Sequence, residues 1–241
     1  MGFIKNVLKN LFKENTIILK QRISENAYRI KIKGENIKTT DFIPGYFLRV
    51  GVGFEDDKLS LHNSVRSYSV WNIDKIDGTM DLAVATHSKG VGAKWIAECK
   101  EGDIVRYNWK KGTFILDDTA DSYLFVGDLS ALSHLYIIQR NLPQSKQIES
   151  IVYSSHKDEL YADINESMPL NFYELPENPV DEIIGIIEKI VPKMTGKKMV
   201  YIGGDSRVCV TLNRYFKNEL NWNSKQIKTK PFWNPDKKGL E

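Results

Sequence analysis

The chain has 241 residues, of which 41% are hydrophobic and 27% charged, and its formal net charge is +3. This composition excludes disordered and collagen-like proteins, and so small a net charge does not favour a nucleic-acid-binding surface. The length allows one large domain or two compact ones, and we expect two.

The first segment, GFIKNVLKNLFKEN at 2–15, has apolar residues at helical spacing opposite Lys5, Lys9 and Lys13. This spacing predicts an amphipathic helix. Such a helix either lies on a membrane surface or packs against its own protein, and the pattern leaves both alternatives open.

Short strands are expected between residues 16 and 115, because β-branched and aromatic runs alternate there with turn signals such as Asp77-Gly78. Six strands within about one hundred residues predict a small antiparallel β-barrel. One helix interrupts them and is expected to begin near Gly92. The predicted strands are TIILKQRI, AYRIKIKG, YFLRVGV, VRSYSVWNI, TMDLAVATH and DIVRYNW.

From about residue 120 onward, predicted strands alternate with predicted helices, which favours a parallel sheet covered on both faces. The segment 112–121 reads as the linker. We therefore expect an antiparallel barrel domain at 1–115 and an α/β domain at 116–241. The strands of the second domain are SYLFVGD, ESIVYSS, KKMVYIGG and IKTKPFW, and its helices are SALSHLYIIQRNLP, VDEIIGIIEKIV and SRVCVTLNRYFKNEL.

The strand RSYSVW at 66–71 carries residue types that suit a flavin dinucleotide. The guanidinium of Arg66 can bind a diphosphate, the ring of Tyr68 can cover an aromatic system, and the hydroxyl of Ser69 can bond a ring nitrogen. Strand alternation puts Arg66 and Tyr68 on one face and Ser69 on the other. The plain alternative is an exposed arginine beside a packed tyrosine.

The glycine-rich segment SKGVG at 88–92 precedes the expected helix. Backbone N–H groups and the positive end of a helix dipole would then form a second clamp for a diphosphate. His87 is either a cofactor contact or a structural histidine.

Five ordered segments resemble the siderophore-interacting protein family, which comprises flavin-dependent ferric-siderophore reductases of the ferredoxin reductase-like superfamily. The matching segments are RSYS at 66–69, HSKGVGAKW at 87–95 with KEGD at 100–103, VGDLSALSHL at 126–135, YIGGDSRVCVTLNRYF at 201–216 and KPFWNPDKKG at 230–239.

The resemblance implies a ferredoxin reductase-like fold with FAD in the barrel domain. Ser69 would lie near flavin N5 and is the candidate catalytic residue. Ala93 departs from the family, which commonly has a serine or threonine there, and Val91 replaces a common proline. The residues implied to bind FAD are Arg66, Ser67, Tyr68, Ser69, Thr86, His87, Gly90, Val91, Gly92 and Ala93.

The turn VGDLSALSHL would face a nicotinamide dinucleotide in the wider superfamily, with Gly127, Asp128 and Ser130 as candidate contacts. Ser130 is either a helix cap or a phosphate contact. The residues SSHK at 154–157 do not decide between NADH and NADPH, and reduced ferredoxin stays open as the electron donor.

The implied activity is reduction of a ferric siderophore with release of Fe(II). Nicotinamide gives up two electrons together and Fe(III) accepts one, so a flavin suits the position between them. Ferric siderophores are often anionic, and a basic rim is therefore expected. Its candidates are Arg49, Lys94, Lys228 and Lys230.

Two other functions remain possible on the sequence. The chain could be a general NAD(P)H:flavin or ferredoxin-type reductase with a different acceptor, or a non-catalytic flavin- or siderophore-binding module.

The two cysteines, Cys99 and Cys209, lie far apart and outside any CxxC motif. They cannot by themselves build a zinc site or an iron–sulfur cluster within one chain, and we expect no metal site in the protein. No apolar run approaches the roughly 20 residues that span a bilayer, and the N-terminus lacks a signal-peptide core. We therefore expect a cytoplasmic protein without a transmembrane segment.

Overall fold

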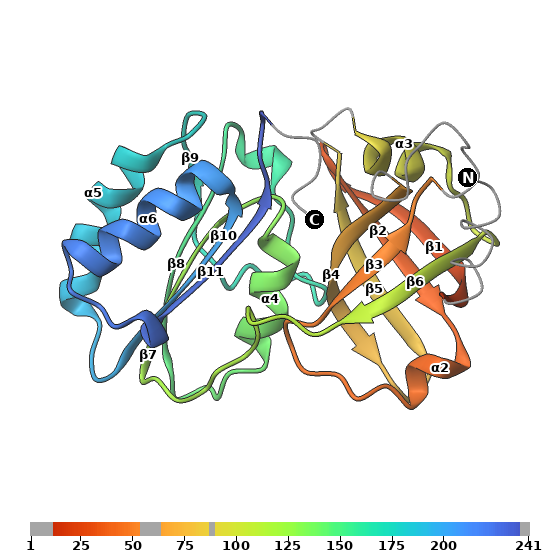
Figure 1. Ribbon diagram of the computed structural model, residues 1–241, viewed down its shortest axis with the longest axis horizontal. Helices are drawn as coiled ribbons and strands as arrows, with labels where there is room; N and C mark the ends of the chain where they lie inside the picture. The colour runs from red at the N-terminus through yellow and green to blue at the C-terminus, as the bar shows by residue number, and fades with distance from the viewer. Residues whose placement is uncertain (1–11, 54–63, 87–89, 237–241) are drawn as a thin grey trace. The chain divides into compact units, whose positions relative to one another are not determined.

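The computed structural model describes residues 12–53, 64–86 and 90–236. The chain divides into two compact units, with the boundary between Gly112 and Thr113. Figure 1 shows a barrel in the first unit and a sheet with helices in the second.

Unit 1 is a closed barrel of six antiparallel strands in the order β1-β2-β5-β4-β3-β6. The expected small antiparallel barrel is therefore confirmed. Alternate residues fill its interior, and Ile30, Leu48, Leu82 and Tyr107 are fully buried. The strands are β1 (Lys13–Ser24), β2 (Ala27–Lys33), β3 (Phe47–Gly51), β4 (Val65–Asp74), β5 (Thr79–Ala85) and β6 (Ile104–Lys110).

Two helices accompany the barrel strands. The short helix α2 (Glu35–Lys38) follows β2, and α3 (Val91–Glu98) lies between β5 and β6 in the chain. Helix α3 begins at Val91, one residue from the expected start, because Gly90 takes an extended conformation at the N-cap. The sequence pattern did not predict α2, since four residues are too few to show a helical period.

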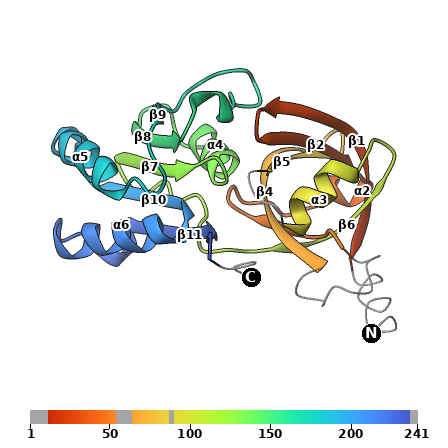
Figure 2. The same ribbon diagram turned by 90° about the horizontal axis from the view of Figure 1, so that it is seen from above.

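Unit 2 contains a five-stranded parallel sheet in the order β11-β10-β7-β8-β9. The central strand β7 is buried along its whole length, as expected for a strand covered on both faces. Figure 2 shows α5 and α6 on one face of this sheet and α4 on the other. The strands are β7 (Ser122–Asp128), β8 (Gln147–Ser154), β9 (Phe172–Glu174), β10 (Lys198–Asp205) and β11 (Ile227–Trp233); the helices are α4 (Leu132–Arg140), α5 (Val180–Ile190) and α6 (Ser206–Asn218), with short 3-10 helices at Lys157–Glu159, Val191–Lys193 and Ser224–Gln226.

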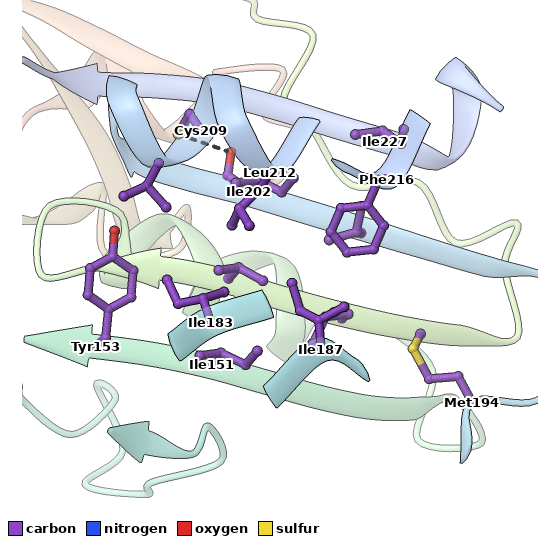
Figure 3. Close-up of a cluster of buried hydrophobic side chains, with 14 residues drawn as sticks. Ile151, Tyr153, Ile183, Ile187, Met194, Ile202, Cys209, Leu212, Phe216 and Ile227 are labelled. Atoms are coloured by element: carbon purple, nitrogen blue, oxygen red, sulfur yellow. Dashed lines mark hydrogen bonds between the residues drawn. The ribbon is translucent and has the colours of Figure 1, made fainter. Parts of the chain in front are cut away.

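Alternation along β7 builds a different core on each face of the sheet. Leu124 and Val126 join a cluster beneath α5 and α6 that includes Ile183, Leu212 and Phe216 (Figure 3). On the α4 face, aromatic rings predominate, and the ring centroids of Phe125 and Tyr201 lie 5.4 Å apart.

Within the part of the chain that the structure describes, no helix is long and apolar enough to cross a membrane.

Candidate functional site

The RSYS residues lie near the start of β4, which pairs with β3 and β5. In the register with β3, Tyr68 lies opposite Leu48 and Arg66 opposite Val50, whereas Ser67 lies opposite Arg49. Residues directly opposite each other in antiparallel strands share a face. Arg66 and Tyr68 therefore point to one side of β4, and Ser67 and Ser69 point to the other.

The N-terminus of α3 lies directly against this strand. A Cβ atom added to Gly92 would overlap the hydroxyl of Tyr68 and would come within 3.8 Å of Cγ of Arg66. One helical turn further on, the ring of Trp95 lies 5.7 Å from the ring of Tyr68 at an interplanar angle of 32°. The two segments expected to bind a cofactor, 66–69 and 90–93, therefore meet at one place.

The α3 terminus suits an anion. Its N-cap residue is Gly90, which has no side chain to cap the helix, and its first turn contains no acidic residue. Backbone N–H groups and the helix dipole then favour negative charge at this end. The guanidinium of Arg66 is held close to β4, because its Nη1 donates a hydrogen bond to the backbone oxygen of Val65 at 2.7 Å.

These features fit a flavin dinucleotide. Diphosphate recognition needs a fixed cation and oriented amides, and an isoalloxazine ring needs an aromatic surface. Arg66, the start of α3 and Tyr68 supply these groups within one small region. The closeness of Gly92 to Tyr68 leaves no room for a side chain at this position, so the backbone of α3 comes close to the Tyr68 hydroxyl.

The remaining expected cofactor residues lie on β4, after β5 and in α3 where the structure describes them. Ser69 is buried on β4 opposite Phe47. Thr86 follows β5, where its backbone N–H donates to the carbonyl oxygen of Asn26 at 2.8 Å. Ala93 lies in the first turn of α3, partly buried. His87 lies outside the described residues.

The four expected basic residues divide between the two units. Arg49 is half-buried on β3, and Lys94 is exposed on α3, where Nζ lies 3.9 Å from the carboxylate of Glu98. In unit 2, Lys228 forms an ion pair with Asp117 at 3.2 Å, and Nζ of Lys230 lies 5.5 Å from the ring centroid of Phe232. Lys228 therefore also stabilises the segment at the start of unit 2, which contains Asp117.

Asp128 lies at the carboxyl end of β7, and its carboxylate is a centre of hydrogen bonding. Oδ1 accepts from the backbone N–H and the hydroxyl of Ser130, at 2.9 and 2.5 Å. Oδ2 accepts from the backbone N–H of Asp205 and from the indole Nε1 of Trp233, both at 2.8 Å. Gly204, the residue before Asp205, has a φ of +118°, and a Cβ atom added to it would overlap the Asp128 carboxylate. Glycine is required here on both conformational and steric grounds.

On the α4 face of the same edge, Phe232 packs with His134 and Phe114. The ring of Phe232 lies 5.6 Å from that of His134 and 6.3 Å from that of Phe114. Burial lowers the pKa of His134 to about 3, so this histidine is neutral at physiological pH. Its Nε2 lies 2.7 Å from the carbonyl oxygen of Phe114, which can only accept, and this nitrogen therefore carries the proton.

Two contacts in these regions were not anticipated from the sequence. The first is the packing of Trp95 on Tyr68. The spacing of Trp95, three residues after Gly92, could have indicated this contact, because it places Trp95 one helical turn beyond the proposed diphosphate clamp. The hydrogen bond from Trp233 to Asp128 joins residues 105 positions apart, and no local pattern indicates it.

Two family models match this chain, one in each unit. Residues 120–236 match the family described as "Siderophore-interacting protein", and residues 14–115 match the family described as "Oxidoreductase FAD-binding domain". The ferric vibriobactin reductase ViuB of Vibrio cholerae is 21% identical over 235 residues, which cover 90% of this chain and 87% of that protein.

Solved structures show the same fold. A siderophore utilization protein from T. fusca has a TM-score of 0.75 at 16% identity, with 95% of both chains covered. The siderophore-interacting protein SipS from Aeromonas hydrophila also has a TM-score of 0.75 at 16% identity, with 94% of this chain and 92% of that one covered. Ferredoxin-NADP+ reductase from Plasmodium falciparum has a TM-score of 0.69 at 14% identity, over 92% and 96% of the two chains. The expected ferredoxin reductase-like fold is confirmed.

Proposed function

Since this chain belongs to the siderophore-interacting protein family and carries an oxidoreductase FAD-binding domain, we propose that it uses FAD to reduce ferric siderophores to Fe(II) in the cytoplasm. One observation carries the proposal most directly. The helix terminus at Gly92 lies against Tyr68 and Arg66, so a cation, an anion-binding helix end and an aromatic ring converge. We assign FAD to the barrel domain, residues 1–115.

Each residue of this region has a proposed task in holding FAD. Arg66 and the amides at the start of α3 bind the diphosphate, because a fixed guanidinium and a helix terminus both favour it. Tyr68, supported by Trp95, covers the ring system. Ser69 donates a hydrogen bond near flavin N5, and Ser67, Thr86 and His87 complete the surroundings. FAD itself supplies a carrier that accepts electrons in pairs and releases them singly.

Arg49 is proposed to attract the ferric chelate to the barrel domain, together with Lys94. Lys228 and Lys230 are proposed to serve the same purpose from unit 2. Positive charge raises the encounter rate with an anionic ligand more than it raises affinity. After reduction, Fe(II) binds hard oxygen donors weakly, so the metal leaves its chelator.

The direct test is anaerobic and does not depend on the electron donor. The FAD-loaded protein is reduced by light with a sacrificial donor, and a ferric siderophore is added together with a chromogenic Fe(II) chelator. We expect reoxidation of the flavin at the rate at which the ferrous complex forms. Reduced protein that reacts with free flavin or ferredoxin but leaves ferric siderophores unchanged would instead indicate a general reductase.

We expect Arg66→Ala to impair FAD retention more than Ser69→Ala does. The first change removes a charge-assisted contact with a diphosphate, and the second removes one neutral hydrogen bond, so we expect a difference of about tenfold in dissociation constant. Apoprotein titrated with FAD, followed by flavin fluorescence, measures both variants. Equal dissociation constants would count against Arg66 as the diphosphate ligand.

Reversing the charge of Arg49 should slow the encounter with an anionic chelate without changing the flavin. We expect Arg49→Glu to lower the second-order rate of flavin reoxidation by about three- to tenfold at low salt, with the difference shrinking at high salt or with a neutral chelate. Stopped-flow absorbance measures this rate. Lys189→Glu, an exposed site on α5, makes the same change in net charge and is the matched control. If the two variants respond alike, Arg49 has no special part in docking.

A further inference from the structure

The last two residues of β11 close the carboxyl edge of the parallel sheet from both faces. Phe232 lies on the α4 face, where a Cβ on Gly203 would come within 3.1 Å of its ring. Trp233 lies on the other face and reaches across the end of β10 to bond Asp128 on β7. In open α/β sheets, nucleotides bind at this edge, in the crevice outside the strand ends. Here the protein's own C-terminal strand fills that position.

In the turn between β7 and α4, the amides from Ser130 onward are also engaged. Every backbone N–H from Ser130 to Leu135 already has an acceptor within unit 2. Ser130 N–H donates to the Asp128 carboxylate, Ala131 to the Asp128 carbonyl, Leu132 to the Leu129 carbonyl, Ser133 to the Tyr161 hydroxyl, and His134 and Leu135 to the Ala131 carbonyl. A diphosphate would have to break these bonds beside a carboxylate.

The N-terminus of α6, which follows β10, is capped by a side chain of the protein. Asp205 caps α6 by accepting the backbone N–H of Arg207 at 2.8 Å, and its carboxylate pairs with the Arg207 guanidinium at 2.6 Å. An acidic side chain therefore lies in the turn before α4, where Asp128 accepts the Ser130 N–H, and another lies at the N-cap of α6. Helix α3 in unit 1 differs, because its N-cap is Gly90 and its first turn contains no acidic residue.

We infer that Phe232, Trp233 and Asp128 form a plug that excludes NADH and NADPH from the carboxyl edge of this sheet and so determines which electron donor the protein uses. The inference rests on the proposed flavin reductase function. Asp128 acts as a positioning residue, since its carboxylate fixes both the indole of Trp233 and the turn at Ser130. The reductant then delivers its electrons to the flavin without docking a dinucleotide at this edge.

Calorimetric titration of the FAD-loaded protein with NADH and with NADPH tests the plug directly. We expect no saturable binding by the parent up to about 1 mM, and at least about tenfold tighter binding by the double variant Phe232→Ala/Trp233→Ala. Far-UV circular dichroism and the flavin spectrum establish that the variant is folded. A parent dissociation constant below about 0.1 mM would overturn the inference, and so would a folded double variant that binds no better than the parent.

A second measurement covers the case in which the double variant does not fold. The indole N–H resonance of Trp233 is assigned by its loss in Trp233→Phe, which keeps an aromatic ring in place. We expect this resonance to stay unchanged when NADPH is added to the parent, and a saturable shift would contradict the plug. Both measurements report binding alone, whereas the photoreduction experiment reports ferric-siderophore reduction, so failure of the inference and failure of the proposed function are distinguishable.

Discussion

Replacing Gly92 by alanine is expected to cost the protein most of its FAD affinity while leaving its fold intact. The added methyl group overlaps the hydroxyl of Tyr68, which must move away from its place beside Trp95. Because the overlapping atom is the terminal hydroxyl of a side chain and not a backbone atom, we expect the ring to move aside while the barrel keeps its fold. We expect the FAD dissociation constant to rise by at least about tenfold, measured by fluorescence titration of the apoprotein.

Gly185→Ala is the matched control for this substitution. Gly185 lies within α5, and a Cβ there would have nothing within 4 Å. Alanine is favoured over glycine inside a helix by roughly 1 kcal/mol, so this variant should be as stable as the parent or slightly more stable, with unchanged FAD affinity. A Gly92→Ala protein that binds FAD like this control would show that the flavin does not occupy the surface formed by β4 and α3.

The architecture could largely be predicted from the sequence because its signals are local. Short β-branched runs before residue 115 and alternating strands and helices after 120 predict the barrel and the parallel sheet, and both are present. The elements that escaped prediction are short: α2 has four residues and β9 has three. Elements of this length do not show a full period of hydrophobicity, so tertiary contacts decide them.

Only part of the candidate site could be predicted, for the same reason. The chemistry of Arg66, Tyr68 and the glycine-rich turn is visible in the sequence, because each residue type indicates its possible ligand. Their convergence is not visible, since the contact of Gly92 with Tyr68 depends on how α3 folds back onto β4. The sequence offered Asp128 as a candidate dinucleotide contact, and its bond to Trp233 depends on the parallel pairing of β7, β10 and β11.

The second large effect is expected at Asp128, where removal of the carboxylate should destabilise unit 2. In Asp128→Ala, the backbone N–H groups of Ser130 and Asp205 and the indole of Trp233 all lose their acceptor. A buried donor left without a partner costs about 1–3 kcal/mol, and partial access of water to this edge reduces the sum. We expect a loss of about 3 kcal/mol, which corresponds to a decrease in Tm of about 6–12 °C.

A double-mutant cycle separates the Trp233 contact from the rest of this loss. Trp233→Phe keeps an aromatic ring and removes only the donor, so it should cost about 1 kcal/mol in the parent and almost nothing once Asp128 is alanine. The exposed Asp158→Ala on the 3-10 helix after β8 should stay within about 0.5 kcal/mol of the parent. If Asp128→Ala melts within about 2 °C of this control, or if the two substitutions are additive, the Asp128 carboxylate does not hold the strand ends together. The plug would then lack the anchor that keeps Trp233 over the end of β10.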